Sequence, residues 1–525
     1  MTEKKAEFNL PELTELQNII LSNRISSNPE AYLNPQFKDI QKPISLETNN
    51  QDLSKALDII HKAINKKKRI GLYCDYDVDG STSTAMFFNV LTTYLKHQNI
   101  KVFIPNRFKG YGIHDEMIES INKANIDLLI TGDLGISESE NIKKINCPVV
   151  VTDHHIVPED GCQNAYAVIN PYLSEYDNNI CGCAVTWLLS CALTKKDLID
   201  DLDYVGLATI ADMVSLTSIT NRFFAREGIK VINKAKRPCW DVLPKVDDNY
   251  IGFMLAPRIN SDSRINGKNE NALKYLITRS YPDAQKYSDL LVKINEERKK
   301  LQKIDINKYE PDNIIFDFKK EYNEGVIGLI ANNLADKFGT ALVMTDGDDK
   351  IVGSSRSKGR IHLQNALQEF NKEYPDVFIK FGGHASAAGF TVHKTKFNLF
   401  KNKIKDHLNK YIDNSEIIEY YDYNMSNEIT LDTLKEIDDL SPYGQGFKRP
   451  LFRGQFKLTK PKTMGKEKAH MNMLLNDMKG VRFFSLDDEE YLMSMEDKKV
   501  DIIYEASIND FRGKNVQLII RDIIK

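Results

Sequence analysis

Residues 69–80 read RIGLYCDYDVDG, and this stretch decides the fold of the N-terminal half. Its first part, residues 69–74, is short and mostly apolar, as expected of a buried strand. Three carboxylates follow at alternate positions, Asp75, Asp77 and Asp79, before a glycine. Carboxylates this close repel one another and destabilise the fold unless a cation neutralises them. The stretch therefore predicts a strand whose carboxyl end carries a metal site.

Helical segments and short apolar strands alternate around this stretch. We expect helices over residues 56–68 and 82–96, and further strands over 102–104, 128–130 and 149–151. Such alternation is typical of a parallel, doubly wound α/β sheet. Because ligands bind beyond the carboxyl ends of the strands in these sheets, polar residues that follow a strand are candidate site residues.

Three more polar clusters follow segments that we interpret as strands. Asp133 comes after the third strand of the predicted sheet, and His154 and His155 come after the fourth. Asp212 follows the apolar run 207–210, which we also expect to be a strand. Carboxylates mixed with imidazole suit Mn²⁺, with Mg²⁺ as a substitute. A carboxylate bridging two such ions, about 4 Å apart, would create a two-metal hydrolytic arrangement.

Each cluster also has a simpler interpretation. The Asp-x-Asp-x-Asp-Gly run resembles the start of an EF-hand calcium loop, but Met86 stands where that loop needs a glutamate. A histidine pair is more often a surface or capping feature, and Asp212 alone could be a helix N-cap. Because all four clusters follow predicted strands, we prefer the metal site to these separate explanations.

The middle of the chain predicts a second α/β unit. A long helical pattern covers residues 285–304, and strands are expected at 314–316, 341–344 and 351–353, with a helix over 326–338. Residues 353–357 read GSSRS, which offers hydroxyls, backbone N–H groups and one guanidinium to a phosphate. Residues 382–384 read GGH and allow close backbone approach beside an imidazole. Taken alone, glycine pairs mostly serve turns.

The charge of the chain changes sign abruptly near residue 440. Acidic side chains dominate residues 411–440 and basic ones dominate 441–470, which indicates a domain boundary. The runs 500–504 and 516–520 predict a small β-barrel or sandwich after it.

Basic and aromatic side chains alternate at the start of this last unit. Such a mixture suits single-stranded DNA, because charges track phosphates and rings stack on bases. The alternative is a solvated basic face over core phenylalanines, and we expect several of these phenylalanines in the core even if the lysines bind DNA. The residues concerned are Lys448, Arg449, Arg453, Lys457, Lys460, Lys462, Lys466 and Lys468, with Phe447, Phe452 and Phe456.

The composition describes an ordinary globular chain. Its 525 residues exceed what one hydrophobic core supports and suggest three or four domains. The net charge of -3 excludes a histone-like polycation but not a basic groove within a neutral protein. No apolar run reaches the roughly 18 residues that cross a bilayer, so we expect no membrane association. Seven cysteines without paired C-x-x-C spacing, and a polar start, predict reduced thiols in a cytoplasmic protein.

These motifs, in this order, resemble a known family. The run from Asp75 to Gly80, together with Asp153-His154-His155, is similar to the DHH phosphoesterase superfamily and more specifically to the RecJ single-strand-specific exonucleases. The resemblance begins at about residue 55 and runs to the C-terminus. It is also carried by Pro105-Asn106-Arg107-Phe108, Ala256-Pro257-Arg258-Ile259-Asn260, Ser263-Arg264, Gly325-Val326-Ile327-Gly328, Phe381-Gly382-Gly383-His384-Ala385, Pro442-Tyr443-Gly444 and Gln517-Leu518-Ile519-Ile520-Arg521-Asp522.

The resemblance implies an α/β protein of several parts. A parallel-sheet DHH domain would be joined by a long helix to a smaller α/β DHH-associated domain, followed by a C-terminal oligonucleotide-binding (OB) β-barrel. The expected division is 1–50 as an N-terminal extension, 51–284 as the DHH domain, 285–310 as the connecting helix, 311–415 as the DHH-associated domain, 416–440 as an acidic connector and 441–525 as the OB domain.

The resemblance also implies roles for individual residues. Asp77 would bind one metal ion and Asp79 the other, with Asp133 bridging them. Asp75 would lie near the first ion, while His154 and Asp212 would complete the second site. His155 would face the substrate phosphate. The expected DNA- and phosphate-binding residues are Arg107, Arg258, Asn260, Ser354, Arg356, Gly383 and His384.

The implied activity is a metal-dependent 5′→3′ exonuclease that hydrolyses single-stranded DNA to 5′-mononucleotides in repair or recombination, using two Mn²⁺ or Mg²⁺ ions. A divalent ion lowers the pKa of a bound water, so no Ser or Cys nucleophile is needed. One alternative is a DHH phosphodiesterase acting on short oligoribonucleotides or nucleotide phosphates; another is a non-catalytic replication scaffold. Family analogy suggests a monomer, with a single-stranded-DNA-binding protein or a helicase as a partner.

Overall fold

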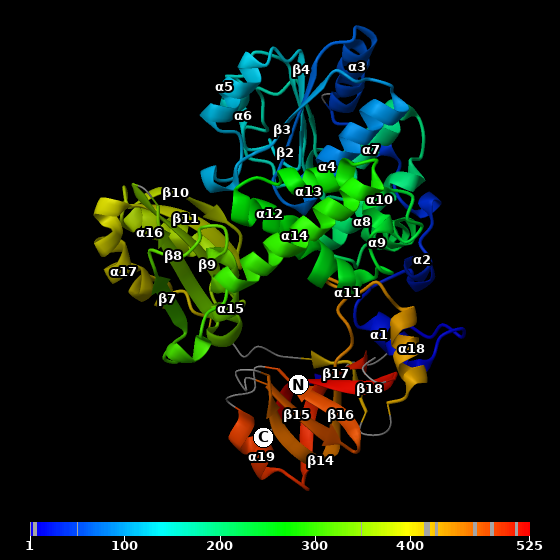
Figure 1. Ribbon diagram of the computed structural model, residues 1–525, viewed down its shortest axis with the longest axis vertical. Coiled ribbons are helices and arrows are strands. Elements are labelled where there is room, and N and C mark those ends of the chain that lie inside the picture. The colour runs from blue at the N-terminus through cyan, green and yellow to red at the C-terminus, as the bar shows by residue number, and fades with distance from the viewer. Residues whose placement is uncertain are drawn as a thin grey trace.

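The structure is a computed structural model. It describes residues 2–3, 8–49, 51–347, 349–413, 420–425, 429–465, 470–483, 488–509 and 513–524. Figure 1 shows a large α/β unit at the top, a smaller α/β unit at the left and a β-rich unit at the bottom. None of the described helices combines the length and the hydrophobicity needed to span a bilayer.

The large unit is built on a five-stranded sheet in which neighbouring strands are all parallel, in the order β3-β2-β4-β5-β6. Cys74, the last residue of β2, lies opposite Gly132, the last residue of β4. The carboxyl ends of the central strands therefore meet at one edge, as the sequence predicts. The strands are β2 (Ile70–Cys74), β3 (Ile100–Phe103), β4 (Leu128–Gly132), β5 (Val149–Thr152) and β6 (Ala167–Ile169).

Helices cover both faces of this sheet, and each face has its own hydrophobic core cluster. The larger cluster takes in α3 (Asp52–Asn65), α4 (Val78–Asn89), α7 (Gly182–Thr194), α8 (Leu202–Ala211) and α9 (Ile219–Ile232). The smaller cluster takes in α5 (Asp115–Lys123) and α6 (Ser139–Ile142). A parallel sheet covered on both faces is the doubly wound arrangement that the alternation predicts.

One predicted strand is wrong, because the apolar run 207–210 belongs to helix α8. Almost all of this helix is buried, so its sequence is apolar on every side. A short apolar run of this kind cannot be told from a buried strand by periodicity alone. Asp212 is consequently the C-terminal cap of a helix, and it neither follows a strand nor begins a helix.

After α9 the chain forms a helical layer beside the sheet. It consists of α10 (Pro238–Asp241), α11 (Asp248–Tyr250), a π-helical turn over Ile251–Leu255, α12 (Ala256–Asn266), α13 (Glu270–Ile277) and α14 (Tyr281–Leu301). The long helix expected over residues 285–304 is α14, which begins four residues earlier. Ser280 caps its N-terminus by accepting the amide of Asp283.

The smaller α/β unit contains a mixed sheet in the order β10-β11-β9-β8-β7. Only β7 and β8 are parallel; the other neighbours are antiparallel. The bounds are β7 (Ile314–Phe318), α15 (Ile327–Phe338), β8 (Thr340–Asp346), β9 (Lys350–Ser357), α16 (Leu363–Glu373), β10 (Phe378–Gly383), β11 (Ala387–His393) and α17 (Phe397–Asn409). The GSSRS segment thus ends strand β9.

The C-terminal unit is a six-stranded sheet, β13-β14-β15-β16-β18-β17, in which β14 also pairs with β17. That pairing joins the sheet to itself, so it forms a barrel, as expected. Its elements are β13 (Tyr423–Asn424), α18 (Leu431–Asp439), β14 (Phe452–Met464), β15 (His470–Leu475), β16 (Met478–Arg482), α19 (Glu489–Ser494), β17 (Lys499–Asn509) and β18 (Asn515–Ile524).

The aromatic residues of the basic run do not lie on the surface. Phe447, Phe452 and Phe456 have no exposed area and belong to the core of this unit. The expectation that several of these phenylalanines lie in the core is confirmed for all three, so these rings do not stack on bases. The side chains of Lys448, Lys457, Lys460 and Lys462 are exposed, whereas Lys466 and Lys468 lie outside the described residues.

The N-terminal segment packs into the same core. Helices α1 (Glu15–Ser22) and α2 (Pro29–Leu33) contribute buried side chains to the cluster that holds the barrel phenylalanines. The fully buried guanidinium of Arg222, from α9, lies 4.8 Å from the Tyr32 ring and 4.9 Å from the Phe447 ring. It donates to the carbonyls of Leu440 and Pro442. The large unit, the N-terminal segment and the start of the barrel therefore share one packed junction.

Candidate metal centre and arginine cluster

The positions of the Asp75, Asp77 and Asp79 carboxylates are set by the turn that follows β2. Asp77 is the N-cap of α4, and its side chain accepts the Gly80 amide at 3.1 Å. A Cβ atom at Gly80 would lie 2.2 Å from the carbonyl oxygen of Asp75, so only glycine allows this tight turn. The turn directs Asp75, Asp77 and Asp79 toward the edge where the strands end. Asp75 and Asp79 are buried there.

Two neighbouring strands deliver the next ligands to the same edge. Asp133 is the first residue after β4, and its backbone amide donates to the Thr152 carbonyl at 3.0 Å. Its φ of 59° turns the chain sharply at this point. His154 follows β5, with its Nδ1 2.8 Å from the Ile180 carbonyl oxygen. Because a carbonyl can only accept, Nδ1 carries the proton and Nε2 keeps its lone pair for a ligand.

The Nε2 atom of His154 lies within a ring of carboxylates. It is 3.2 Å from Oδ1 of Asp133, 3.7 Å from Oδ2 of Asp79 and 3.7 Å from Oδ2 of Asp212. Asp212 reaches this point from the C-terminal end of α8. The structure thus brings all six sequence-predicted metal ligands together, although it supplies one of them from a helix.

The candidate ligand atoms form three overlapping groups, each with its atoms within 4.8 Å of one another. The first comprises Asp75, Asp77 and Asp133, and the second comprises Asp79, His154 and Asp212. The third joins Asp133 with His154 and His155. Asp133 belongs to the first and third groups, and its Oδ1 lies 3.2 Å from Nε2 of His154, a member of the second, so Asp133 lies between the first two groups.

The electrostatics of the cluster fit divalent cations. Burial, with repulsion from the other carboxylates, raises the pKa of Asp75 and Asp133 well above the ordinary value, that of Asp79 to about 7 and that of Asp212 to about 9. Burial beside His155 lowers the pKa of His154 to about 4. Among the residues that the structure describes, none gives the buried Oδ1 atom of Asp75 a hydrogen-bond partner. Negative charge that the chain itself does not neutralise is what Mn²⁺ or Mg²⁺ would compensate.

Asp79 is held by the start of a helix as well as by its own turn. Its two carboxylate oxygens accept the amides of Gly182 at 2.6 Å and Cys183 at 2.7 Å, which are the first two residues of α7. The exposed N–H groups and the dipole of a helix N-terminus favour a carboxylate there. These bonds orient Asp79 toward His154 before any cation binds.

His155 is oriented by an aspartate that sequence reasoning did not select as a site residue. Its Nδ1 lies 2.7 Å from Oδ1 of Asp153, which is fully buried and also accepts the Ile136 amide at 2.9 Å. Burial opposes protonation of His155, but the bond to Asp153 outweighs it and raises the pKa of His155 to about 9. The hydroxyl of Tyr111 lies 3.3 Å from the same ring nitrogen. The sequence did contain a sign of this role, because Asp153 is the first residue of the Asp153-His154-His155 motif.

Three arginines from separate elements form a second cluster, here called the arginine cluster: Arg107, Arg264 and Arg356. Arg356 donates from one terminal nitrogen to Oγ of Ser354 at 2.9 Å and to the Ser355 carbonyl at 2.7 Å. Burial and repulsion from Arg107 lower the pKa of Arg356. Among the described residues, no carboxylate lies within ion-pair distance of any of the three.

Arg264 is the member that sequence reasoning missed as a site residue. It projects from the last turn of α12 and donates to the Gly325 carbonyl at 3.1 Å, across the junction of the two α/β units. Burial, Arg107, Arg298 and Arg356 lower its pKa well below the ordinary value. The sequence offered one sign of this role, because Arg264 closely follows the Ala256–Asn260 motif. A group of cations that repel one another is a site prepared for an anion.

The remaining predicted phosphate-binding residues are dispersed around these clusters. Asn260 accepts the Val78 amide at 3.1 Å, directly beside Asp77. Arg258 donates to the Tyr250 hydroxyl at 3.2 Å. Gly383 ends β10 with φ of 152°, and His384 is exposed in the turn to β11, where its amide donates to the Ala387 carbonyl at 2.8 Å. Ala387 pairs with Arg356 across the sheet, so this turn lies beside the arginine cluster.

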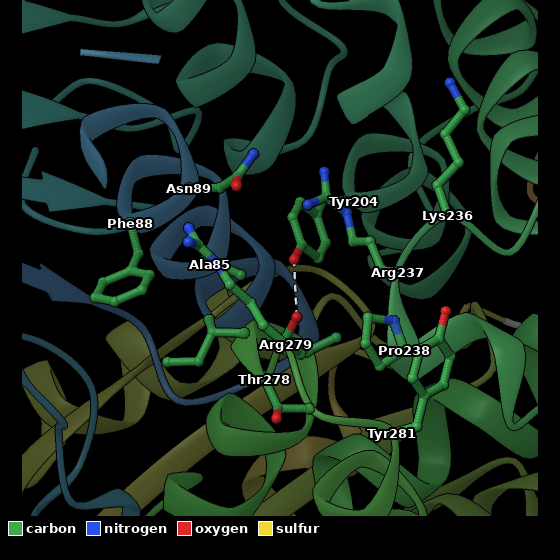
Figure 2. A pocket seen from close by; sticks show the side chains of 12 residues that line it. Ala85, Phe88, Asn89, Tyr204, Lys236, Arg237, Pro238, Thr278, Arg279 and Tyr281 are labelled. Atoms are coloured by element: carbon green, nitrogen blue, oxygen red, sulfur yellow. Dashed lines mark hydrogen bonds between the residues drawn. The ribbon is translucent and has the colours of Figure 1, made fainter. Parts of the chain in front are cut away.

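A pocket of about 300 Å³ lies near the other end of α4 and contains none of the predicted site residues (Figure 2). Its lining includes Phe88 and Asn89 from α4, Tyr204 from α8, and Arg237. The Tyr204 hydroxyl donates to the Leu276 carbonyl at 2.8 Å, and Arg237 pairs with Asp203. Because no residue of the metal or arginine cluster lines it, the pocket is separate from both clusters.

Three family descriptions match successive parts of the chain. They are the "DHH family, N-terminal domain" over residues 69–213, the "DHHA1 domain" over 312–410 and the "RecJ OB domain" over 422–522.

Relatives and solved structures agree with this order. The "Single-stranded-DNA-specific exonuclease RecJ" of Salmonella typhimurium is 28% identical over 527 residues, covering 90% of each chain. The crystal structure of RecJ from Thermus thermophilus in complex with Mn²⁺ superposes with a TM-score of 0.80 at 23% identity, covering 98% of this chain and 76% of that one. The "Crystal structure of exonuclease RecJ bound to manganese" gives a TM-score of 0.59 at 28% identity, covering 69% and 95%.

The parallel sheet with its acidic edge, followed by the smaller α/β unit, defines a DHH protein of the type that carries a DHHA1 domain. The matched OB domain narrows this class. In its domain order and over most of its length, the chain is similar to the RecJ single-stranded-DNA-specific exonucleases.

Proposed function

We propose that the chain is a divalent-metal-dependent exonuclease that degrades single-stranded DNA from the 5′ end to 5′-mononucleotides. The observation that carries this proposal is the pairing of a buried acidic cluster with an arginine cluster that has no carboxylate partner among the described residues. An enzyme that removes single nucleotides needs a hydrolytic centre and, beside it, a site for the terminal phosphate. RecJ relatives named as single-stranded-DNA-specific exonucleases support the choice of substrate.

The six metal ligands would hold two Mn²⁺ or Mg²⁺ ions. Asp75 and Asp77 would bind the first, Asp79, His154 and Asp212 the second, and Asp133 would be shared. Two such ions lower the pKa of a bound water and stabilise charge on the phosphate oxygens. The residues of the chain fix where this chemistry occurs, because Asp79 is locked by α7 and His154 by the Ile180 carbonyl.

The polarity of cleavage would come from the arginine cluster. Arg107, Arg264 and Arg356 would bind the 5′-terminal phosphate, with Ser354 and the turn at Gly383 and His384 beside them. A guanidinium binds a terminal phosphate dianion through charge-assisted and bidentate hydrogen bonds. The next phosphodiester would then lie over the acidic cluster, where His155, held by Asp153, would donate a hydrogen bond to it.

The barrel would bind the rest of the strand by charge. Its exposed lysines Lys448, Lys457, Lys460 and Lys462 would contact phosphates, while its phenylalanines form the core. Contacts of this kind are independent of base sequence and weaken with salt. A role in DNA repair or recombination follows from the same proposal.

The test is an end-labelling experiment with pure protein and Mn²⁺. Oligonucleotides of DNA or RNA, single- or double-stranded and labelled at either end, are sampled over time. We expect a 5′-labelled DNA strand to release labelled mononucleotide at once, and a 3′-labelled strand to shorten progressively. Preferential cleavage of RNA dinucleotides would favour an oligoribonuclease, and no cleavage of any substrate with either metal would favour a scaffold.

A further inference from the structure

The aromatic side chain of Phe253 projects from the surface of the large unit and takes no part in its core. Phe253 is 78% exposed, and its neighbour Met254 is 40% exposed. Both lie in the π-helical turn Ile251–Leu255, whose two end residues are buried. The turn is thus anchored to the core at both ends and presents Phe253 outward. Among the described residues, no side chain of comparable size and hydrophobicity is more exposed.

Phe253 lies on the same helical stripe as residues already placed at the candidate site. Residues 248–266 form one continuous helical run. Tyr250, Phe253, Pro257, Asn260 and Arg264 follow one another at spacings of three and four residues, and none of them is buried. Side chains at these spacings share one face of an α-helix, and the wider π-helical turn, with its i→i+5 bonds, rotates Phe253 from that face by a fraction of a turn. Phe253 therefore projects to the same side as Asn260 and Arg264 without lying directly in line with them.

The residues on this helix face follow the order in which a DNA strand would meet the arginine cluster, the metal centre and the surface beyond it. Arg264, at one end, belongs to the arginine cluster. Asn260, one turn earlier, holds the Val78 amide beside the metal ligand Asp77. Phe253 comes next, seven residues before Asn260, which is about 10 Å at 1.5 Å per residue.

The other end of the stripe leads toward the barrel. Asp248, at the start of the helical run, accepts the Tyr443 amide at 2.7 Å and the Ser441 hydroxyl at 3.2 Å. Both partners lie in the segment that enters the barrel. Figure 1 shows α11 at the lower edge of the large unit, on the side of the barrel. Phe253 therefore lies between the metal centre and the unit whose exposed lysines would carry the strand.

We infer that Phe253 is a base-stacking residue that positions single-stranded DNA on the 3′ side of the scissile phosphodiester. This inference rests on the proposed function. If the 5′ phosphate is bound by the arginine cluster, the strand crosses the acidic cluster at Asn260 and continues toward Phe253. A stacked strand advances about 3.4 Å per nucleotide, so the ring meets the base about three nucleotides beyond the cut. Stacking tolerates any sequence, because every base has a flat face.

The proposal assigns Phe253 to substrate binding and not to the chemical step. Replacing a stacked aromatic side chain by alanine weakens single-strand binding by about five- to 150-fold. We expect Phe253→Ala to raise KM for a long 5′-phosphorylated strand within this range and to leave kcat within about twofold. Phe253→Trp should retain binding. A dinucleotide, which is too short to reach Phe253, should be cleaved equally by all variants.

A spectroscopic readout separates stacking from a general loss of structure. In the inactive Asp133→Asn background, strands carry 2-aminopurine at the third, fourth or twelfth nucleotide from the 5′ end. The probe at the third or fourth position should be quenched on binding, and Phe253→Ala should remove that quenching. The matched control is Tyr281→Ala, which removes an aromatic side chain that is 52% exposed and lies off this stripe.

The outcomes distinguish this inference from the proposed function. If the wild-type chain cleaves single-stranded DNA but Phe253→Ala has the same KM and the same quenching, the stacking role is wrong and the proposed function stands. Equal losses in Phe253→Ala and Phe253→Trp, with unchanged quenching, would overturn the stacking role and assign the exposed ring to local packing. If the wild-type chain cleaves no strand, the proposed function fails first.

Discussion

Arg356 provides the sharpest test of the proposed polarity. One of its terminal nitrogens is used by Ser354 and the Ser355 carbonyl, which leaves the donors on the other terminal nitrogen and on Nε for a ligand. A guanidinium carries five N–H donors in a rigid fork, so the remaining three suffice for a bidentate contact with a phosphate. Arg356→Ala should therefore reduce the preference for a 5′-phosphorylated strand over a 5′-hydroxyl strand.

The size of the effect follows from the number of hydrogen bonds that the substitution removes. A hydrogen bond to a charged group contributes about 1.5–3 kcal/mol. One such bond corresponds to about a ten- to 150-fold difference in rate at low substrate concentration. The wild-type preference should lie in this range or above it, and Arg356→Ala should lower it by about tenfold or more. Because Arg107 and Arg264 remain, a residual preference should persist.

The assay measures initial release of mononucleotide from matched strands that differ only at the 5′ terminus, at substrate concentrations below KM. Lys358→Ala is the matched control, since it removes a cation two residues away whose side chain pairs with Asp336 at 2.6 Å. Its preference should equal that of the wild type. Equal rates for both wild-type substrates, or inhibition by a 3′ block, would refute the assignment of the arginine cluster to the 5′ phosphate. An unchanged preference in Arg356→Ala would refute the role of this residue.

Three further outcomes are expected. Asp133→Asn should abolish Mn²⁺-dependent hydrolysis while preserving strand binding, because it removes the ligand that we propose to be shared by both ions. Substantial residual turnover would contradict that shared position. The metal-free protein should gain thermal stability as the pH falls from 9 to 7. The pKa of Asp212 rises to about 9 in the folded state, so over this window the folded protein binds more protons than the unfolded chain. Scanning calorimetry with and without Mn²⁺ tests this, and a melting temperature that falls as the pH is lowered from 9 to 7 would contradict it. Replacing Lys448, Lys460 and Lys462 by alanine should lower the slope of log affinity against log salt by about two, with dinucleotide cleavage unchanged; an unaltered slope would mean that these lysines do not contact the strand.

Point substitutions are preferable to truncation of the barrel. Helix α1 packs into the barrel core, and Arg222 is buried against the carbonyls of Leu440 and Pro442. Deleting residues 441–525 would expose the apolar face of α1 and remove the Ser441 and Pro442 carbonyls that the buried Arg222 guanidinium donates to, which is strongly destabilising. A loss of activity in such a truncation would therefore report on folding as well as on DNA binding.

The sequence by itself determined the sheet and most of the metal centre. The apolar runs before Asp75, Asp133 and His154 are short and end in polar residues, and the adjacent carboxyl ends of parallel strands bring such residues together. These are local patterns, so they can be interpreted without knowing the packing. The Asp-x-Asp-x-Asp-Gly pattern also identifies Asp79 as a candidate ligand. The hydrogen bonds from the start of α7 to Asp79 cannot be predicted from that pattern.

Only the tertiary structure decided the rest. A buried helix and a buried strand are both apolar throughout, so the sequence could not reveal that Asp212 ends a helix. The phenylalanines of the basic run alternate with lysines whether they face the core or a DNA strand, and burial alone identifies them as core. Arg264 and Arg356 belong to different units, and the N-terminal helices reach the barrel across more than 400 residues of sequence. Such contacts depend on how separate units pack, which no local periodicity encodes.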